Sequence, residues 1–367
     1  MLKIQEHIIQ HGLEETIAKF KLNLKDLGHK VMLKYDQIES SNKYIEVQEA
    51  RGLVLEKGTW WIMSMPFTRF YTHDDFYAAK LDLTNTVFTE KRDGTLIQVY
   101  WDYVTETWSI NTMFSECEDK FFNREITLKE VFLDLMKKYD SSFDLFEKGF
   151  TYIFELTSPY NKVVVRYSEP ELRLIGVKKL DTLEEYNFWL MNLVSRYIKI
   201  PLIEEYKFYS IEECLDSFQG KSFNFEGYVA FDGDNRIKIK NPAYVAVHLT
   251  KRMKDELLDI TNPYIFLDIV KQNEIAEFTT SFPHASELIV DLQNRYNALI
   301  KKLHKAKEQI GTITDKKELS IKIQSVILEN GIKPDLNSVF FMLNNGKIKS
   351  IEEYLQKCDN KKLIKLI

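Results

Sequence analysis

Up to about residue 250, short apolar and β-branched runs alternate with polar turns along the chain. Such runs predict strands, and we expect them at residues 52–56, 59–62, 96–101, 151–156, 162–166, 171–177, 227–231 and 236–240. Apolar residues at helical spacing predict helices at residues 128–139 and 183–197. Residues 1–250 are therefore predicted to form an α+β domain built on antiparallel sheets with flanking helices.

After His248 the strand-like alternation ends, and apolar residues recur three and four positions apart. Asp315 with Glu318 predicts the start of one helix, and Asn330-Gly331 predicts its end. We therefore expect an all-α C-terminal domain over residues 251–367. The clearest helix of this domain has an apolar side made of Leu288, Leu292, Tyr296, Leu299, Leu303 and Ile310.

The chain has 367 residues, enough for two domains that each bury a core, and its 44% hydrophobic and 29% charged residues are typical of a soluble globular protein. The formal net charge of -5 argues against binding of nucleic acid by bulk electrostatics, but it allows a local basic groove. The amino terminus lacks the features of a secretory signal, and no apolar run is long enough to span a bilayer. Cys117, Cys214 and Cys358 are too widely spaced for a disulfide framework or a zinc site, so we expect a cytoplasmic protein with no membrane segment.

Residues 90–95, Glu-Lys-Arg-Asp-Gly-Thr, place the motif Lys-x-Asp-Gly between two strand-like runs. Asp-Gly is the commonest two-residue hairpin turn, so one interpretation is a plain turn with a coincidental lysine. The other interpretation is that the hairpin presents Lys91 as a nucleophile. Its amine would then attack the α-phosphorus of a nucleoside triphosphate and hold the nucleotide as a phosphoramidate.

Two arginines precede this motif in strand-like contexts. Arg51 lies in Ala50-Arg51-Gly52, and Arg69 lies in the run from Pro66 to Tyr71. Guanidinium groups offer forked donors that suit triphosphate oxygens, so both arginines are candidate phosphate contacts. For Arg51, an exposed position at the start of a strand is the competing interpretation.

Glu155 follows the motif in a run of apolar and aromatic residues. Strand alternation puts Ile153 and Glu155 on one face, with Phe154 and Leu156 on the other. A carboxylate on an apolar face is costly to bury without a partner, and a ribose hydroxyl or a hydrated metal would provide one. Alternatively, Glu155 lies at a strand end and reaches water.

Two further motifs follow. Glu226 opens an apolar strand just before Gly227, where its carboxylate could hold a divalent cation. A plain turn followed by a strand would have the same sequence pattern, and it is the competing interpretation. In Lys238-Ile239-Lys240, alternation puts both ammonium groups on one face, where an anion between them would relieve their repulsion. Lysines that protect an exposed strand edge are the competing account.

The order Arg, Lys-x-Asp-Gly, strand Glu, Glu-Gly and Lys-x-Lys resembles the covalent nucleotidyltransferase superfamily, which contains DNA ligases, RNA ligases and mRNA capping enzymes. Within it, the chain resembles the RNA ligase 1 family, the phage-type tRNA-repair ligases. Leu96 stands where DNA ligases usually carry arginine, and the tail after Lys240 predicts helices rather than an OB-type β-barrel. The blocks that carry the closest resemblance are residues 50–52, 66–71, 91–95 and 154–165.

This resemblance implies an ATP-dependent RNA ligase that joins 5′-phosphate and 3′-hydroxyl ends through lysyl-AMP and RNA-adenylate. Lys91 would accept AMP from ATP, and Asp93 would orient the lysine or a metal-bound water. Glu155 and Glu226 would serve the ribose and Mg²⁺, or Mn²⁺ in its place. Arg51, Arg69, Lys238 and Lys240 would contact phosphates, and the two lysines would also act in catalysis. Glu90, Tyr71 and Gly94 would belong to the nucleotide-binding site.

RNA is the implied partner, in particular a structured or nicked tRNA, with functional coupling to an end-healing polynucleotide kinase-phosphatase. The resemblance further implies a monomer in the cytoplasm, which is the host cytoplasm if a phage encodes the protein. The C-terminal domain is a candidate module for tRNA specificity. Its longest predicted helix carries a basic tract that is either a solvated face or an RNA contact, made of Arg295, Lys301, Lys302, His304, Lys305 and Lys307.

Two positions depart from the family pattern. Lysine is usual where Arg69 stands, and the block from Ser109 to Ser115, around Met113, lacks the usual phosphate-binding lysine. One phosphate contact is therefore without an assigned residue. A capping guanylyltransferase that uses GTP at Lys91 is an alternative function. An inactive module that binds RNA or nucleotide is another, although the motif residues that it would have lost are present.

A nucleophilic lysine must lose its proton, and a free lysine amine has a pKa of about 10.4. We expect the cations Arg51, Lys238 and Lys240, together with bound Mg²⁺, to disfavour protonated Lys91 and so to lower the pKa of its amine.

Overall fold

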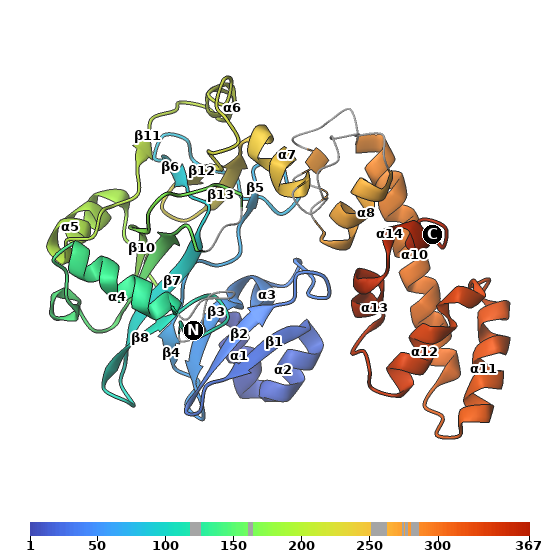
Figure 1. The fold of residues 1–367 in the computed structure, drawn as a ribbon. Coiled ribbons are helices and arrows are strands. Elements are labelled where there is room, and N and C mark those ends of the chain that lie inside the picture. The colour runs from blue at the N-terminus through green and yellow to red at the C-terminus, as the bar shows by residue number, and fades with distance from the viewer. Residues whose placement is uncertain (118–125, 161–163, 251–262, 274, 276–277, 280–285) are drawn as a thin grey trace. The chain divides into compact units, whose positions relative to one another are not determined.

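The computed structural model describes residues 1–117, 126–160, 164–250, 263–273, 275, 278–279 and 286–367 (Figure 1). Contacts between Cα atoms divide the chain into two compact units. The first comprises Met1–Asp36 with Ser40–Lys251, and the second comprises Gln37–Glu39 with Arg252–Ile367. Antiparallel sheets with flanking helices make up the first unit, and helices make up the described part of the second, so the predicted α+β class is confirmed.

The first sheet has four antiparallel strands in the order β1-β2-β3-β4. These strands are β1 (Leu22–Asp26), β2 (Lys30–Tyr35), β3 (Arg51–Glu56) and β4 (Ile62–Ser64). One hydrophobic cluster joins them to α1 (Lys3–His11), α2 (Leu13–Phe20) and α3 (Ile45–Glu49). Glu49 stabilises the start of α1, because its carboxylate accepts hydrogen bonds from the backbone N–H groups of Lys3, at 3.2 Å, and Ile4, at 2.8 Å.

The second sheet is also antiparallel and has the order β10-β9-β7-β8. Its strands are β7 (Thr95–Asp102), β8 (Thr107–Asn111), β9 (Phe150–Thr157) and β10 (Glu171–Lys179). A cluster of buried residues joins one face of this sheet to α4 (Leu128–Lys138), the 3-10 helix η1 (Phe143–Leu145) and α5 (Phe188–Ile198). Phe154 and Leu156 belong to this cluster and Ile153 to another, so the predicted alternation of faces along β9 is confirmed.

The third sheet has the order β11-β6-β12-β13-β5. Its strands are β5 (Tyr71–Thr72), β6 (Val87–Lys91), β11 (Glu205–Tyr206), β12 (Gly227–Phe231) and β13 (Arg236–Lys240), and α6 (Ile211–Asp216) packs on it. Ile237 and Ile239 are buried in the core beneath the sheet, as the alternation in β13 predicts.

The predicted hairpin around Asp93-Gly94 is wrong. β6 pairs with β11 and β12, whereas β7 pairs with β8 and β9 in the second sheet. Residues 92–94 therefore carry the chain from one sheet to another, although the local sequence is that of a hairpin turn. Lys91, the last residue of β6, lies at this crossing.

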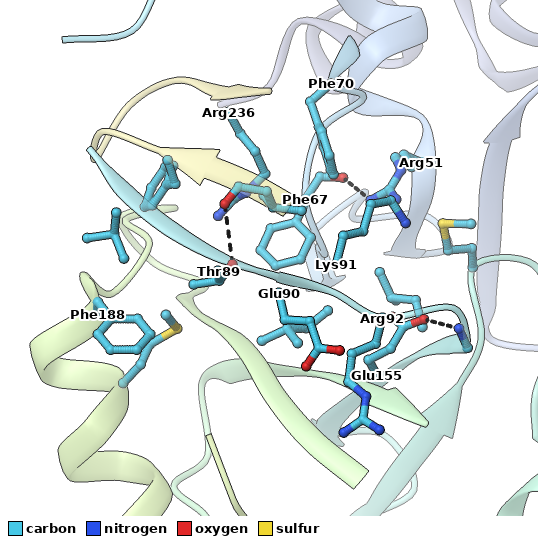
Figure 2. Close-up of a pocket in the computed structure, with 18 residues that line it drawn as sticks. Arg51, Phe67, Phe70, Thr89, Glu90, Lys91, Arg92, Glu155, Phe188 and Arg236 are labelled. Atoms are coloured by element: carbon cyan, nitrogen blue, oxygen red, sulfur yellow. Dashed lines mark hydrogen bonds between the residues drawn. The ribbon is translucent and has the colours of Figure 1, made fainter. Parts of the chain in front are cut away.

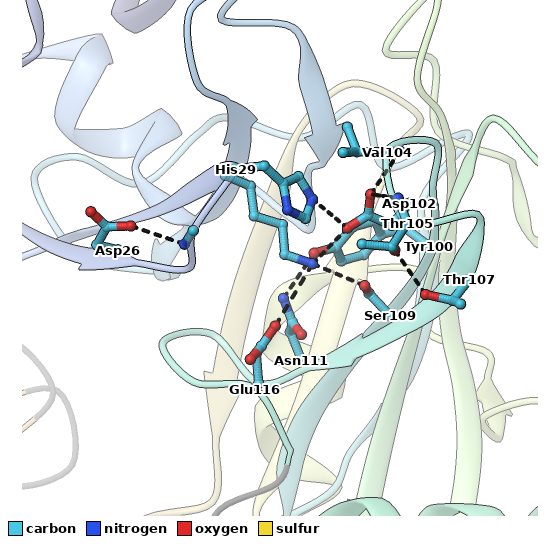
Figure 3. Close-up of polar contacts among 12 residues, drawn as sticks. Asp26, His29, Tyr100, Asp102, Val104, Thr105, Thr107, Ser109, Asn111 and Glu116 are labelled. Atoms are coloured by element: carbon cyan, nitrogen blue, oxygen red, sulfur yellow. Dashed lines mark hydrogen bonds and ion pairs between the residues drawn. The ribbon is translucent and has the colours of Figure 1, made fainter.

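A buried polar network links the first and second sheets (Figure 3). Lys30, at the start of β2, is 3% exposed, and its Nζ lies 2.9 Å from Asp102 Oδ2 at the end of β7. The same carboxylate oxygen lies 2.8 Å from His29 Nε2, and Lys30 also donates to Ser109 Oγ at 3.0 Å. The pKa of Asp102 is held below its ordinary value because the hydrogen bond and charge of Lys30 outweigh burial. Removal of one partner of such a pair leaves an uncompensated buried charge, which is strongly destabilising.

α7 (Pro242–Thr250) closes the first unit, and the described part of the second consists of helices. Asp315 caps α11 by accepting from the N–H groups of Lys317 and Glu318, and Asn330 follows its last residue, so both predicted ends are confirmed. Leu288 is 58% exposed and Ile289 is buried instead, which corrects one member of the predicted apolar side of α10. The helices are α8 (Pro263–Lys271), α10 (Ser286–Ile310), α11 (Lys316–Glu329), η3 (Pro334–Leu336), α12 (Asn337–Asn344), α13 (Ile351–Lys357) and α14 (Asn360–Leu363).

Most predicted strands are confirmed, and those at residues 227–231 and 236–240 have the expected ends. The strand expected at 59–62 is wrong except for its last residue, because Trp60 has a φ of 59° in a turn. Residues 162 and 163 of the strand expected at 162–166 lie outside the described residues, and 164–166 are not a strand. The helix expected from residue 183 begins at Phe188, because Asn187 caps it there. No described helix is both long and apolar enough to cross a membrane.

Candidate active site

A pocket of about 230 Å³ lies between the second and third sheets (Figure 2). On the third sheet, the strand register aligns side chains of β6, β12 and β13 in rows: Lys91, Gly227 and Lys240, then Thr89, Val229 and Lys238, then Val87, Phe231 and Arg236. Six of these residues line the pocket: Val87, Thr89, Lys91, Val229, Phe231 and Arg236. Leu96, Glu155 and Ile175 line it from the second sheet.

Lys91, which lines the pocket, forms an ion pair with the buried Glu226. The Nζ atom of Lys91 lies 2.7 Å from Glu226 Oε1, and Lys240 Nζ lies 4.0 Å from the same oxygen. The side chain of Glu226 is 5% exposed and that of Lys91 is 24% exposed. Burial works against the charge of Lys91, yet Glu226 and then Glu155 outweigh it, so the pKa of Lys91 is raised above its ordinary value. The expectation that neighbouring cations lower this pKa is therefore wrong for the protein without ligands.

Glu155 is the second carboxylate at the lysine. It lines the pocket, and its Oε1 accepts a hydrogen bond from the backbone N–H of Gly94 at 3.0 Å. Burial raises the pKa of Glu155 to about 7, the charge of Glu226 adds to the rise, and Lys91 opposes it. A Cβ at Gly94 would lie 2.5 Å from the carbonyl oxygen of Leu156, so the glycine of the motif permits this close approach of β7 to β9.

Asp93 is 4% exposed, and three groups of the protein hold its carboxylate. The Oδ2 atom accepts from the N–H groups of Val164 and Val165, each at 2.7 Å, and Oδ1 accepts from the Tyr244 hydroxyl at 2.8 Å. These contacts fix the crossing between β6 and β7 that carries Lys91. They also explain why residues 164–166 are not a strand. Orientation of the lysine or of a water by Asp93 stays a prediction.

Arg51 lines the pocket, and its contact with phosphate stays a prediction. Its Nη1 atom is 3.4 Å from the carbonyl oxygen of Phe67, and its guanidinium lies 5.2 Å from the centre of the Phe70 ring. Burial lowers the pKa of Arg51. Glu90 and Gly94 also line the pocket, and burial raises the pKa of Glu90.

Six of the sequence-predicted residues do not line the Lys91 pocket: Asp93 and Glu226, described above, and Arg69, Tyr71, Lys238 and Lys240. Arg69 and Tyr71 line an adjoining pocket of about 640 Å³, in which the Arg69 guanidinium lies 4.0 Å from the centre of the Tyr35 ring. The two pockets share Phe70, Phe231 and Arg236. Lys238 and Lys240 lie in the rows described above, and Lys240 reaches the site through Glu226. Phosphate contacts by Arg69, Lys238 and Lys240 stay predictions.

Sequence reasoning missed Arg236, Phe67 and Phe188, which all line the pocket. Arg236 could have been found, because alternation in β13 puts it on the same face as Lys238 and Lys240. Phe67 and Phe188 had no such signal, since they come from a loop and from α5. Met113 lines the pocket as well, but among the described residues no lysine other than Lys91 does, so the phosphate contact missing from residues 109–115 stays unassigned.

The donor set fits a hard divalent cation. Glu155 and Glu226 are neighbouring carboxylates with raised pKa values, chiefly because of burial, and a cation's charge would favour the ionised form of both. Within the described residues, no three His, Cys, Asp or Glu side chains gather as a metal site. One or two carboxylates completed by water and phosphate oxygens are the usual protein ligands of Mg²⁺.

The fold and the site together are those of a protein with a candidate nucleophilic lysine for group transfer. A lysine amine ends one strand, a buried carboxylate accepts its hydrogen bond, and an arginine and a second carboxylate lie beside it. Such a lysine can act as a nucleophile in group transfer.

The comparisons with known proteins place the chain within this class. A family described as RNA ligase matches residues 49–244, and the chain belongs to this family. The resemblance to RNA ligases that the motifs indicate is thereby confirmed.

Curated relatives resemble a larger part of the chain. A protein of Autographa californica nuclear polyhedrosis virus, named as a bifunctional polynucleotide kinase/RNA ligase, is 28% identical over an alignment of 325 residues, with 81% of this chain and 44% of the viral protein covered. The RNA ligase of Rhodothermus phage RM378 is 24% identical over 360 residues, with 81% of this chain and 80% of that protein covered. The chain thus spans less than half of the viral relative. Among solved structures, an archaeal ATP-dependent RNA ligase matches 90% of this chain and 91% of its own, with 13% identity and a TM-score of 0.47.

Proposed function

We propose that this protein is an ATP-dependent RNA ligase that seals 5′-phosphate and 3′-hydroxyl RNA ends through a lysyl-AMP intermediate on Lys91. The observation that carries the proposal is the position of Lys91 Nζ, 2.7 Å from the buried Glu226 carboxylate in a pocket that Arg51 and Glu155 also line. Membership of the RNA ligase family supports the same activity.

In the first step, the Lys91 amine attacks the α-phosphorus of ATP. The Nζ–phosphorus bond forms while the bond to the bridging oxygen breaks, and pyrophosphate leaves. Lys91 must first lose a proton. Glu226 Oε1 now accepts the hydrogen bond of this amine, and Mg²⁺ at that carboxylate would weaken the pair and favour loss of the proton to water. Mg²⁺ held by Glu155 and Glu226 would spread the charge that develops on the phosphates.

In the second step, an oxygen of the RNA 5′-phosphate attacks the phosphorus of lysyl-AMP, and the Lys91 amine leaves. In the third, the 3′-hydroxyl of the other RNA end attacks the activated 5′-phosphate, a phosphodiester bond forms and AMP leaves. Lys240 is the last residue of β13 and lies in the same row as Lys91. Its ammonium group supplies positive charge there for the phosphates of ATP and RNA.

The proposal assigns different tasks to the two units. The first unit carries the adenylyltransferase site, and the helical unit contributes recognition of a structured or nicked tRNA. The name of the viral relative, a bifunctional polynucleotide kinase/RNA ligase, supports coupling to a separate end-healing kinase-phosphatase. We further propose that the protein acts as a monomer in the cytoplasm.

Labelling with α-³²P-ATP and Mg²⁺ tests the nucleophile. Wild-type protein should acquire a covalent label, and Lys91→Ala and Lys91→Arg should acquire none, because neither presents a neutral amine at this position. Lys179→Ala is the matched control: Lys179 lies on β10 and pairs with Asp181 at 3.1 Å, so labelling should persist. Retained label in Lys91→Ala would refute the assignment.

The same assay separates the alternative functions. Label from GTP in place of ATP would indicate a capping guanylyltransferase, and label from neither nucleotide would indicate an inactive binding module. Addition of RNA with a 5′-phosphate and a free 3′-hydroxyl to labelled wild-type protein should discharge the label and yield a sealed product. Labelled protein that never discharges to RNA would contradict the ligase reaction.

A further inference from the structure

The Lys91 pocket has two chemically different ends. Figure 2 shows Arg51, Lys91 and Glu155 toward one end and Thr89, Phe188 and Arg236 toward the other. The row of Arg236 lies four residues along the strands from the row of Lys91, which is about 13 Å at about 3.3 Å per residue. A nucleotide joined through its phosphorus to Lys91 would therefore extend its base toward the aromatic end.

Arg236 is the charged group of the aromatic end. Its guanidinium lies 4.0 Å from the centre of the Phe67 ring and 4.1 Å from that of Phe231, so both rings contact it. Its side chain is 12% exposed. Such stacking fixes the plane of the guanidinium, and a fixed plane makes its donors directional.

Glu185 holds the terminal fork of Arg236. Nη1 donates to Oε2 at 3.2 Å, and Nη2 donates to Oε1 in a second, shorter contact. The side chain of Glu185 is only 9% exposed, so the pair is shielded from water. The two parallel contacts are the strong bidentate arrangement of arginine and carboxylate.

The backbone fixes Glu185 in this place. Glu185 forms an antiparallel bridge with Lys178 of β10, and the N–H of the next residue, Tyr186, donates to the carbonyl oxygen of Val177 at 2.9 Å. Two residues beyond Tyr186, Phe188 begins α5 and lines the pocket. Glu185 itself lines the adjoining pocket, and it reaches the Lys91 pocket through Arg236, which lines both.

The hydrogen-bonding groups of adenine and guanine differ, and the Arg236–Glu185 pair bears on which of the two bases the pocket accepts. Guanine presents two adjacent acceptors, O6 and N7, and a bidentate arginine is their commonest specific partner. Adenine presents a donor at N6 beside the N7 acceptor, so it cannot accept both bonds. An arginine with a free fork at the base end would therefore favour guanine. Glu185 occupies that fork.

We propose that Glu185, by occupying the fork of Arg236, is a specificity-determining residue that makes the pocket select adenine over guanine nucleotides. The inference rests on the proposed function, since it requires that Lys91 accept the nucleotide. Glu185 acts through Arg236 and is a positioning residue rather than a catalytic one.

The test compares Lys91 labelling by ATP and by GTP in the full-length protein. In Glu185→Gln, one anionic oxygen is lost and the fork is partly freed, so the ATP:GTP ratio of kcat/KM should fall about tenfold or more. The double variant Glu185→Gln/Arg236→Met should not show the improved labelling by GTP, because it lacks the guanidinium donors that Glu185→Gln frees. Glu184→Gln should keep the wild-type ratio, because Glu184 lines the adjoining pocket as Glu185 does but the ion pair with Arg236 is made by Glu185.

An unchanged ATP:GTP ratio in active Glu185→Gln, or a gain for GTP that persists without Arg236, would overturn the inference. A measurement on wild-type protein covers the case in which the variants fail to fold. Because the fork is occupied, 7-deaza-ATP, which lacks N7, should label Lys91 as well as ATP does; a large loss would mean that Arg236 contacts the base, and would also overturn it. Failure of wild-type protein to label with ATP would instead refute the proposed function.

Discussion

The charge of Lys91 shows how a single residue depends on its neighbours. Basic motifs in the sequence led to the expectation that cations lower the pKa of its amine, yet Glu226 and Glu155 raise it in the folded protein. The carboxylates are the nearer partners, at 2.7 Å in the case of Glu226. Lys91 is therefore protonated and paired before ATP binds, and the protein must remove a proton as the reaction begins.

Glu226→Gln should lower the pKa of Lys91, because the carboxylate is the largest influence that favours the ammonium form. In competitive labelling with an amine-reactive reagent followed by mass spectrometry, the midpoint of Lys91 modification against pH should move to lower pH. Glu171→Gln is the control, since Glu171 pairs with Arg92 at 2.6 Å, and it should leave the midpoint in place. An unmoved midpoint in Glu226→Gln would contradict the pairing.

Glu155 offers a second test at the residue scale. With a pKa raised to about 7, this carboxyl is half protonated near neutral pH in the protein without ligands, and it loses its proton as pH rises. Infrared difference spectra of wild-type protein should show a protonated carboxyl band that disappears as pH rises through about 7. The band should be absent in Glu155→Gln. A band in wild type with no change through that range would be evidence against the raised pKa.

At the scale of elements, β12 brings the motifs together. It lies between β6 and β13, so Gly227 is aligned with Lys91 on one side and with Lys240 on the other. A Cβ at Gly227 would lie 2.2 Å from the carbonyl oxygen of Ile239, and its φ is +150°. Glycine at this position therefore permits the approach of β13 that places Lys240 near Glu226.

Gly227→Ala should lower the free energy of unfolding by about 2–5 kcal/mol, because steric overlap adds to backbone strain. Gly233→Ala is a matched control with a φ of +109° and no atom within 4 Å of the added Cβ, and it should cost only about 1–2 kcal/mol of strain. Chemical denaturation monitored by circular dichroism measures both. Equal losses in the two variants would mean that contact with β13 is not limiting.

At the scale of the whole molecule, the helical unit carries charge that its own contacts do not use. In the basic tract of α10, Arg295 pairs with Asp291 at 3.1 Å and His304 with Glu352 at 2.7 Å. Lys301, Lys302 and Lys305 are exposed, and no ion pair is found for them in the part of the chain that the structure describes. Lys307 of the same tract is also exposed and has no ion pair among the described residues, so these four lysines are the part of the tract available to an RNA backbone.

Replacement of Lys301, Lys302 and Lys305 by glutamine in the full-length protein should raise the KM for sealing a nicked tRNA roughly tenfold and weaken its salt dependence, because phosphate contacts are lost. Self-adenylylation should be unchanged. Lys317 and Lys322 of α11, replaced in the same way, serve as the control for lost charge on the same unit. If the α10 variant seals nicked tRNA as well as wild-type protein does, its lysines only face solvent and do not contact RNA.

The sequence predicted the positions of strands better than it predicted which strands pair. Strands β12 and β13 match the prediction because alternation is a local property of the chain. The Asp93-Gly94 turn does not, because the same two residues serve a hairpin or a crossing between sheets, and only the partners of β6 and β7 decide which. For the same reason Arg236 was assigned to a strand but not to the site, since Phe67, Phe231 and Glu185 come from distant segments.

By itself, the sequence determined the α+β class, the helical character of the C-terminal part, and a set of charged motifs that carries the resemblance to RNA ligases. These are properties of local patterns and of residue identity. Only the tertiary structure decided that Lys91 faces Glu226, that backbone and tyrosine groups hold Asp93, and that Glu185 holds Arg236. Each of these is a contact between residues far apart in the chain, and its charge and geometry exist only once the sheets have assembled.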